Sequence, residues 1–202
     1  MKVDEWLSFF KNHPQKKMYS LSDISLLVNE PKASLNVQLT RLVQAKILTR
    51  VAQRWYANPF HLPTAEEVAM ILRVPSYLSL EYALARQGVL SQRVYTLTLM
   101  TTRPPYTFHG SQGTFEYHQL KKSLFWGYQT NQEVSIATPE KALLDLLYIR
   151  AVRTKELNQQ GIRSLFDDMH QEMLHQKVLQ RYAKRFGGHT KQLALSLGII
   201  TT

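Results

Sequence analysis

The sequence predicts an α+β protein with two domains, and three observations lead to this expectation. Residues 18–57 contain two amphipathic helical patterns followed by a pair of short strands. Residues 94–136 are rich in β-branched and aromatic residues and contain turn signals. Residues 137–197 have helical patterns almost throughout. At 202 residues with 44% hydrophobic content, the chain is long enough to form one large or two small domains.

The domain boundary is predicted at a short linker. Asn58–Pro59 ends the first strand pair, and a linker runs to Pro63. We therefore expect a first domain at residues 1–60 and a second domain at residues 64–202.

The first domain is expected to begin with a helix from Asp4 to Lys11, which Asn12–His13–Pro14 ends. A short apolar helix and a polar break at Asn29–Glu30–Pro31 follow. The apolar residues of that short helix are Leu21, Ile24, Leu26 and Leu27.

A second amphipathic helix then places Leu35, Leu39 and Leu42 on one face. Strands follow at Ile47–Val51 and Trp55–Tyr56. This order predicts a winged helix-turn-helix, in which the second helix of the motif enters the major groove of DNA.

The charge of this segment favours DNA as its ligand. Between Pro31 and Ala57 there are five cations and no acid, and neutralisation of phosphates by Lys and Arg releases counterions. We expect the face opposite the leucines to read bases through Asn36, Val37, Thr40 and Arg41. We expect Lys32, Ser34, Arg50 and Arg54 to contact phosphates, with Lys32 or Ser34 at the first turn of the helix.

Two other interpretations of this segment remain open. Winged helices also serve as protein-interaction modules, and a cationic helix face is often only solvated. The turn Ala52–Gln53–Arg54 contains no Gly, so Arg50 and Arg54 could be exposed strand ends rather than parts of a wing.

The second domain is expected to alternate helices and strands. A capping box at Thr64 and Glu67 begins a helix that Pro75 closes, and Ser76 or Ser79 begins another that ends near Gly88. A strand is expected at 94–100. Two further strand pairs are expected, one of 106–109 with 114–120 and one around the turn Thr130–Asn131, which gives a small antiparallel sheet.

The C-terminal part is expected to be helical. Thr138 and Pro139 form a helix start, and the apolar run ALLDLLYIRAV that follows is expected to be buried. The tail is expected to form helices at Ile162–Met169, Gln171–Phe186 and Lys191–Leu197.

Net charge, cysteine content and hydropathy limit the partners and the cellular location that the sequence predicts. The net charge of +10 points to an acidic partner such as nucleic acid, a membrane surface or an acidic protein. There is no cysteine, which removes disulfides and thiol chemistry. The sequence contains no apolar run long enough to span a membrane, and the start MKVDEWLSFFKNH does not resemble a secretory signal. We therefore expect a cytoplasmic protein without a membrane partner.

An enzymatic function is not expected. The seven His residues have no metal-ligand spacing, and no phosphate-binding Gly-rich loop occurs, so no metal or cofactor is expected. The alternative is a metal-dependent nuclease that uses Glu116, Glu140, Lys141 and Asp145. Against this, Glu140 suits the first turn of a helix, and Asp145 suits a buried partner of an Arg or Tyr.

Cations of the second domain have two interpretations. Together they could form a basic surface that extends the DNA footprint or holds an acidic partner, or they could be ordinary solvated charges. The residues are Arg103, Lys121, Lys122, Lys141, Arg181, Lys184 and Arg185.

Several segments resemble one known family. The segments are PSYLSLEYALARQGVL at 75–90, the strand and TTR run ending at Arg103, GTFEYHQL at 113–120 and SIATPEKALLDLLYI at 135–149. Together they are similar to the AbiEi family of antitoxins from type IV toxin–antitoxin systems, also described as predicted transcriptional regulators. The winged helix-turn-helix in front fits the layout of that family, whose longer members have a longer C-terminal region.

The resemblance implies two activities. The N-terminal domain would bind double-stranded DNA at the promoter of its own operon and repress it, and the C-terminal domain would counter a nucleotidyltransferase-like toxin. The resemblance does not require a stable complex with that toxin. The alternative is a plain winged-helix regulator without a toxin partner. Operators for such folds are often inverted repeats, so a dimer on DNA is an option that the sequence leaves open.

Overall fold

The computed structural model describes residues 1–153 and 158–200 and has a mixed α and β fold. The chain forms two compact units. The N-terminal unit comprises Met1–Val68 with Gly110–Gln112, and the C-terminal unit comprises Ala69–His109 with Gly113–Thr202. The division falls inside helix α4 (Ala65–Leu72), whereas the sequence placed it in the preceding linker.

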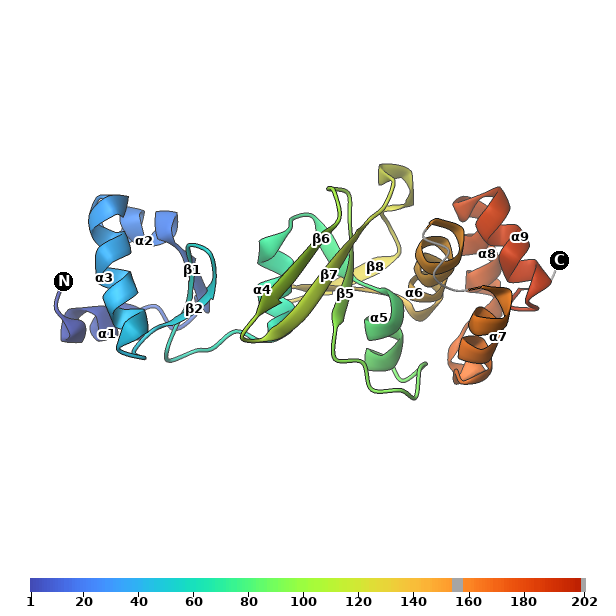
Figure 1. Ribbon diagram of the computed structural model, residues 1–202, viewed down its shortest axis with the longest axis horizontal. Helices are drawn as coiled ribbons and strands as arrows, with labels where there is room; N and C mark the ends of the chain where they lie inside the picture. Colours follow the sequence, from blue (N-terminus) through green and yellow to red (C-terminus); the bar gives the residue numbers. More distant parts are fainter. Residues whose placement is uncertain (154–157, 201–202) are drawn as a thin grey trace. The chain divides into compact units, whose positions relative to one another are not determined.

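The N-terminal unit consists of three helices and a three-stranded antiparallel sheet (Figure 1). The helices are α1 (Val3–Lys11), α2 (Leu21–Val28) and α3 (Lys32–Gln44). The strands are β1 (Met18–Ser20), β2 (Thr49–Ala52) and β3 (Trp55–Ala57), in the order β1-β3-β2. The three helices and the β2–β3 pair lie where the sequence predicts them. Strand β1 was not predicted, whereas β3, which is equally short, was predicted as the second strand of a strand–turn–strand pattern with β2.

The core of this unit forms around the aromatic residues of α1 and the leucines of α3. Trp6 and Phe10 are buried with Leu35, Leu39 and Leu42, as the helical spacing predicts.

The apolar residues of α2 do not all face the core. Leu21 and Ile24 are buried, but Leu26 and Leu27 are 83% and 50% exposed. In a two-turn helix, Leu26 falls on the side opposite Leu21 and Ile24, so the helix cannot bury all four residues against one core.

The C-terminal unit is built on a six-stranded sheet with the order β6-β7-β5-β4-β9-β8. Its strands are β4 (Ser76–Leu78), β5 (Leu97–Thr101), β6 (Tyr106–Gly110), β7 (Gly113–Gln119), β8 (Tyr128–Asn131) and β9 (Val134–Ala137). The predicted small antiparallel sheet is wrong, because β5 pairs with β7 and β4 pairs with β9 in parallel. Strand β4 joins the two halves of the sheet, and it is another three-residue strand that the sequence did not reveal.

The predicted strand pairs are nevertheless present as neighbours in this sheet. Strands β6 and β7 are adjacent, and β8 pairs antiparallel with β9. The turn between β8 and β9 lies at Gln132–Glu133, two residues later than predicted.

Helices of the C-terminal unit pack together around α6 (Pro139–Leu146) (Figure 1). The others are α5 (Leu80–Arg86), α7 (Gln159–Asp167), α8 (Gln176–Phe186) and α9 (Gly188–Ser196), with 3-10 turns η1 (Lys122–Leu124) and η3 (Gln171–Met173). Helix α6 continues as a π-helix, η2 (Leu147–Arg153). The predicted helix at 171–186 is divided into η3 and α8, because Leu174 leaves the helical conformation.

Two predicted helix starts are confirmed. The Thr138 hydroxyl accepts a hydrogen bond from the backbone N–H of Lys141, and Pro139 occupies the first helical position of α6. At α4, the backbone N–H of Thr64 donates to Glu67, and the backbone N–H of Glu67 donates to the Thr64 hydroxyl. Within the described residues, no helix has the length and apolar character needed to span a membrane.

Candidate nucleic-acid interface

The N-terminus of α3 lies at the edge of a basic groove in the N-terminal unit. Pro31 occupies the N-cap position and offers no side-chain acceptor to the first backbone N–H groups of the helix. The first turn contains Lys32 and no acid. Uncapped N–H groups and the helix dipole favour an anion at this position.

The groove forms between α3 and the turn that joins β2 to β3. Its volume is about 440 Å³, and its lining residues are Leu21, Lys32, Ala33, Asn36, Thr40, Arg50, Gln53 and Arg54. Lys32, Asn36 and Thr40 recur every four residues and therefore lie on one side of α3. None of these lining residues is an acid, so the groove presents three cations around polar groups of the helix.

The groove contains five of the eight residues that the sequence assigned to DNA binding, namely Lys32, Asn36, Thr40, Arg50 and Arg54. Arg54 reaches this position through a left-handed backbone (φ 62°), which closes the tight β2–β3 turn without a glycine. The carbonyl of Arg54 accepts a hydrogen bond from the backbone N–H of Leu21 at 2.8 Å, which fixes the turn against the start of α2.

The other three assigned residues are exposed on α3 but do not line the groove. The Ser34 hydroxyl donates to the Glu30 carboxylate at 3.4 Å and accepts from the Gln38 amide at 3.1 Å. That neighbouring carboxylate makes the position of Ser34 less suited to a phosphate than the groove. Val37 is 52% exposed, and Val37 and Arg41 follow one another at helical spacing on the solvent side of α3.

Two polar groups of the groove are already oriented by hydrogen bonds. The Thr40 hydroxyl donates to the carbonyl of Asn36 at 2.6 Å, so it is left as an acceptor for a ligand. The Arg50 Nε donates to the carbonyl of Ala52 at 3.4 Å, which leaves the outer nitrogens of its guanidinium for other partners. The Asn36 amide can offer both a donor and an acceptor to a base edge.

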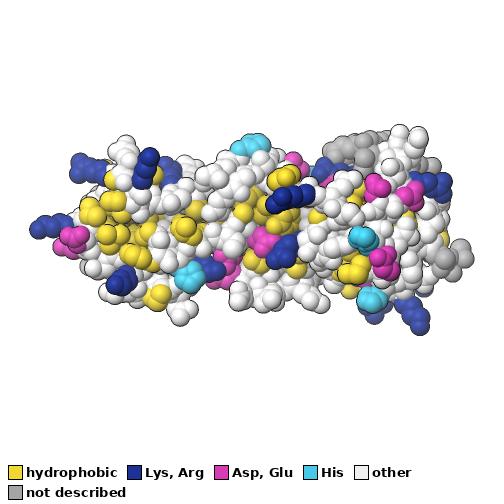
Figure 2. Space-filling view, turned by 90° about the horizontal axis from the view of Figure 1, so that it is seen from below, with side chains coloured by type: hydrophobic (Ala, Val, Ile, Leu, Met, Phe, Trp, Pro, Cys, Tyr) yellow, Lys and Arg dark blue, Asp and Glu magenta, His cyan; other side chains and the backbone are white. Residues whose placement is uncertain are grey.

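Cations and exposed apolar side chains occur together on the molecular surface. Figure 2 shows one face, on which dark blue Lys and Arg side chains lie among yellow hydrophobic ones. On the N-terminal unit, Leu26, Leu27 and Val37 are exposed apolar residues of α2 and α3. Such a surface can contact a partner both through its cations and through its exposed apolar side chains.

The C-terminal unit contains a buried ion pair that the sequence did not predict. Lys141 and Asp145 on α6 have no exposed side-chain surface, and Nζ of Lys141 contacts Oδ1 of Asp145. The Tyr77 hydroxyl donates to Oδ2 of Asp145 at 2.9 Å, and the Ser79 hydroxyl donates to the same oxygen at 2.8 Å. Nζ of Lys141 also donates to the Tyr77 hydroxyl at 2.8 Å.

Aromatic rings enclose this ion pair. Nζ of Lys141 lies 5.2 Å from the ring centre of Trp126 and 4.8 Å from that of Phe186, a cation–π arrangement. At Gly127, an added Cβ would lie 3.0 Å from Cγ of Lys141, and the backbone there has φ +76°. Burial lowers the pKa of Lys141 and raises the pKa of Asp145, because a charge is poorly solvated there.

The structure bears on two of the alternatives that the sequence left open for these residues. Lys141 cannot belong to a basic surface, since it is buried. The four residues of the nuclease alternative do not share one site: Glu140 accepts a hydrogen bond from the backbone N–H of His175, and Glu116 pairs with Arg150. The expectation that Asp145 is a buried partner of an Arg or Tyr is confirmed for Tyr77.

A sequence signal for the pair existed. Lys141 and Asp145 are four residues apart in a helix whose residues between them are apolar, and i,i+4 spacing places opposite charges side by side. Tyr77 and Ser79 carried no such signal. In the described part of the chain, no group of three or more His, Asp or Glu side chains is arranged to hold a metal ion.

No protein-family model matches the chain, and a search of curated proteins found no match.

Proposed function

We propose that the N-terminal unit is a winged helix-turn-helix that binds double-stranded DNA. The observation that carries the proposal is the groove between α3 and the β2–β3 turn, because it joins three cations, an uncapped helix N-terminus and an amide side chain, with no acid in its lining. In this proposal α3 is the recognition helix and the β2–β3 turn is the wing.

Each group has a role that follows from its chemistry. Lys32 and the first N–H groups of α3 bind one phosphate, and Arg50 and Arg54 bind phosphates from the wing. Asn36, Thr40, Val37 and Arg41 face the base edges: the amide pairs with adenine, the guanidinium with guanine, and the valine contacts thymine methyls.

The resemblance to AbiEi antitoxins supports a more specific role. We propose that the protein represses its own operon and counteracts a nucleotidyltransferase-like toxin encoded beside it. In this role the C-terminal unit supports the antitoxin activity, with or without a stable toxin complex.

The first experiment is a fluorescence-anisotropy titration of the full chain with its own upstream DNA and with an unrelated duplex, at two salt concentrations. Tighter binding to the upstream DNA with a steep salt dependence is expected. Arg54→Gly removes a wing cation but suits the left-handed backbone at that position, so it should weaken binding while leaving the fold intact. Lys184→Glu, an exposed charge reversal on α8, is the matched control and should bind as the parent does.

Equal, weak binding to both duplexes would contradict sequence-specific recognition. Unchanged binding by Arg54→Gly would remove the wing from the interface. The antitoxin role has its own test, which is rescue of growth when the chain is expressed with the product of a neighbouring nucleotidyltransferase-like gene. DNA binding without such rescue would favour a plain transcriptional regulator.

A further inference from the structure

A second concave site lies in the C-terminal unit, between helix α5 and the segment that follows it. Its volume is about 360 Å³, within the range of about 300–1,000 Å³ that small-molecule sites occupy. Its lining residues are Tyr82, Ala85, Arg86, Leu90, Ser91, Gln92, Arg93 and Val94. All of them belong to one unit and one continuous stretch of chain, so the site does not depend on how the two units are arranged.

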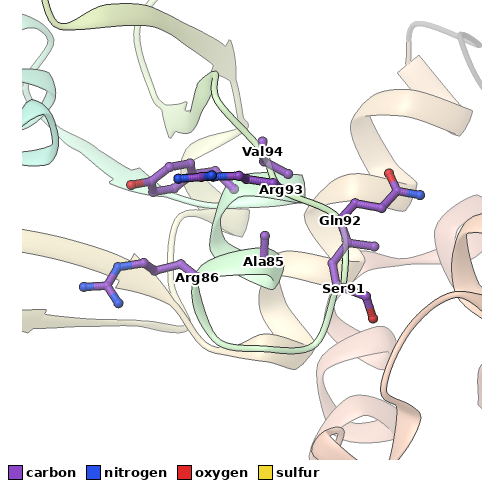
Figure 3. Close-up of a pocket in the computed structure, with 8 residues that line it drawn as sticks. Ala85, Arg86, Ser91, Gln92, Arg93 and Val94 are labelled. Atoms are coloured by element: carbon purple, nitrogen blue, oxygen red, sulfur yellow. The ribbon is translucent and has the colours of Figure 1, made fainter.

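The floor and the rim of this site differ in character. Leu90 is buried, and Ala85 and Val94 are half-buried, which gives an apolar floor. Arg86, Ser91, Gln92 and Arg93 are exposed at the rim. Figure 3 shows the side chains of Arg86 and Arg93 extending in the same direction on either side of Ala85. None of the described residues that line the site is an Asp or Glu.

The cation Arg93 lies near an aromatic ring. Its guanidinium lies 5.5 Å from the ring centre of Tyr95, which is itself 76% exposed. Among the described residues, Arg93 has no carboxylate partner. A planar guanidinium beside an apolar floor suits a ligand that combines a phosphate with a flat ring, because it binds phosphate through two N–H groups.

The chain on the far side of the site is fixed by hydrogen bonds. The Ser91 hydroxyl and Nε2 of His170 lie 3.1 Å apart, and the carbonyl of Val89 accepts from the backbone N–H of His170 at 2.8 Å. These contacts tie the segment after α5 to the segment before η3, so the site is formed before a ligand arrives.

We propose that this site binds a nucleotide unit, with the base on the apolar floor and the phosphate at Arg93. The unit can come from a free nucleotide or from one residue of a single-stranded nucleic acid, since both present a stacking ring and a phosphate. The site is separate from the duplex-binding groove of the N-terminal unit, and the inference does not rest on the proposed repressor function.

The test uses the full chain carrying Arg50→Ala and Arg54→Gly, which removes two cations of the N-terminal groove. ATP binding is measured by calorimetry, and binding of a short labelled single-stranded oligonucleotide by anisotropy. Arg93→Ala removes the proposed phosphate ligand, and Ala85→Leu fills the floor without a change of charge. Arg163→Ala, an exposed arginine on α7 outside the lining, is the matched control.

Both site variants should weaken binding by about tenfold or more, which corresponds to about 1.4 kcal/mol, and the control should not. Binding of ATP alone identifies a free nucleotide as the ligand, and binding of the oligonucleotide alone identifies a single strand. The proposal is overturned if the chain that carries only Arg50→Ala and Arg54→Gly binds neither ATP nor the oligonucleotide. It is also overturned if Ala85→Leu binds as tightly as the parent, since the ring would then not occupy the floor.

Discussion

The buried pair of Lys141 and Asp145 makes a prediction about two variants whose stabilities should change with pH in opposite directions. Asp145→Asn keeps the shape and the hydrogen bonds from Tyr77 and Ser79 but leaves the ammonium of Lys141 without its counter-charge. Lys141→Met leaves the carboxylate of Asp145 without its counter-charge. Removal of one partner of a buried pair costs about 3–5 kcal/mol.

The cost of each variant has a ceiling, because the remaining group can become neutral. Burial already lowers the pKa of Lys141 below its ordinary 10.5 and raises the pKa of Asp145 above its ordinary 3.8. Deprotonation of a lysine costs about 4.8 kcal/mol at pH 7 and about 2 kcal/mol at pH 9. Protonation of an aspartate costs about 4.4 kcal/mol at pH 7 and about 1.6 kcal/mol at pH 5.

The sign of the pH dependence follows from proton counts. In Lys141→Met the folded state holds a proton on Asp145 that the unfolded state releases above pH 3.8, so the free energy of unfolding falls as pH rises. In Asp145→Asn the folded state lacks a proton that the unfolded lysine holds up to pH 10.5, so the free energy of unfolding rises with pH. In the parent, the folded pair holds one proton, on either the amine or the carboxylate, and the unfolded chain also holds one, on the lysine. The pair therefore adds no pH dependence to the free energy of unfolding.

The assay is urea unfolding followed by circular dichroism, between about pH 5 and pH 8, with each slope taken relative to the parent. The double variant Lys141→Met with Asp145→Asn should have the slope of the parent. In each single variant the free energy of unfolding should change by at most about 1.4 kcal/mol per pH unit relative to the parent. Slopes of the same sign, or no slope in either variant, would refute the assignment of these two residues as a closed buried pair.

Three further predictions concern single substitutions. Arg41→Ala should weaken binding to the upstream DNA by about 1–3 kcal/mol in an anisotropy titration, and unchanged affinity would mean that the base-reading face of α3 is misassigned. Burial by itself raises the pKa of the Glu67 carboxyl. The ion pair with Lys17, in which Nζ lies 2.5 Å from Oε1 of Glu67, and the hydrogen bonds from Thr64 outweigh this effect, so the pKa of Glu67 lies below its ordinary value. Glu67→Gln should therefore cost about 1–3 kcal/mol at neutral pH, and urea titrations should show the cost disappearing as acid protonates the parent carboxylate; an equal cost in acid would rule out the ion pair as its source. Gly127→Ala should destabilise the fold by about 1–3 kcal/mol and lower the melting temperature more than Gly88→Ala, which has the same φ of +76° but open space around it; equal losses would show that the contact with the Lys141 side chain costs nothing.

The elements that the sequence predicted well are those whose signals are local. The leucine spacing of α3, the cap at Thr138 and the paired patterns of β6 and β7 depend on residues a few positions apart. Strands β1 and β4 escaped prediction because each has three residues and is defined by its partners. The parallel pairing of β5 with β7 is likewise a property of the assembled sheet, which local patterns do not contain.

The candidate site could be predicted in part for the same reason. Helical spacing placed Asn36 and Thr40 on the face opposite the leucines, and the structure places both in one groove with Lys32. That Arg50 and Arg54 face this groove depends on the register of the β2–β3 turn, which carries an irregularity between Arg50 and Ala52. The proposed nucleotide site after α5 was not predicted, because the family-like segment at 75–90 overlaps it but implied no ligand there, and no charge run marks its residues.

The left-handed backbone at Lys46 and Arg54 has a consequence for engineering. A residue other than Gly in this conformation costs about 1–2 kcal/mol, so replacing both with Gly would be a natural step in making a more heat-resistant variant. Such a redesign would also remove two of the five cations between Pro31 and Ala57. Optimisation for thermal stability alone would thus select against the charge on which the proposed interface depends, and screens for robust variants need a binding readout beside the melting temperature.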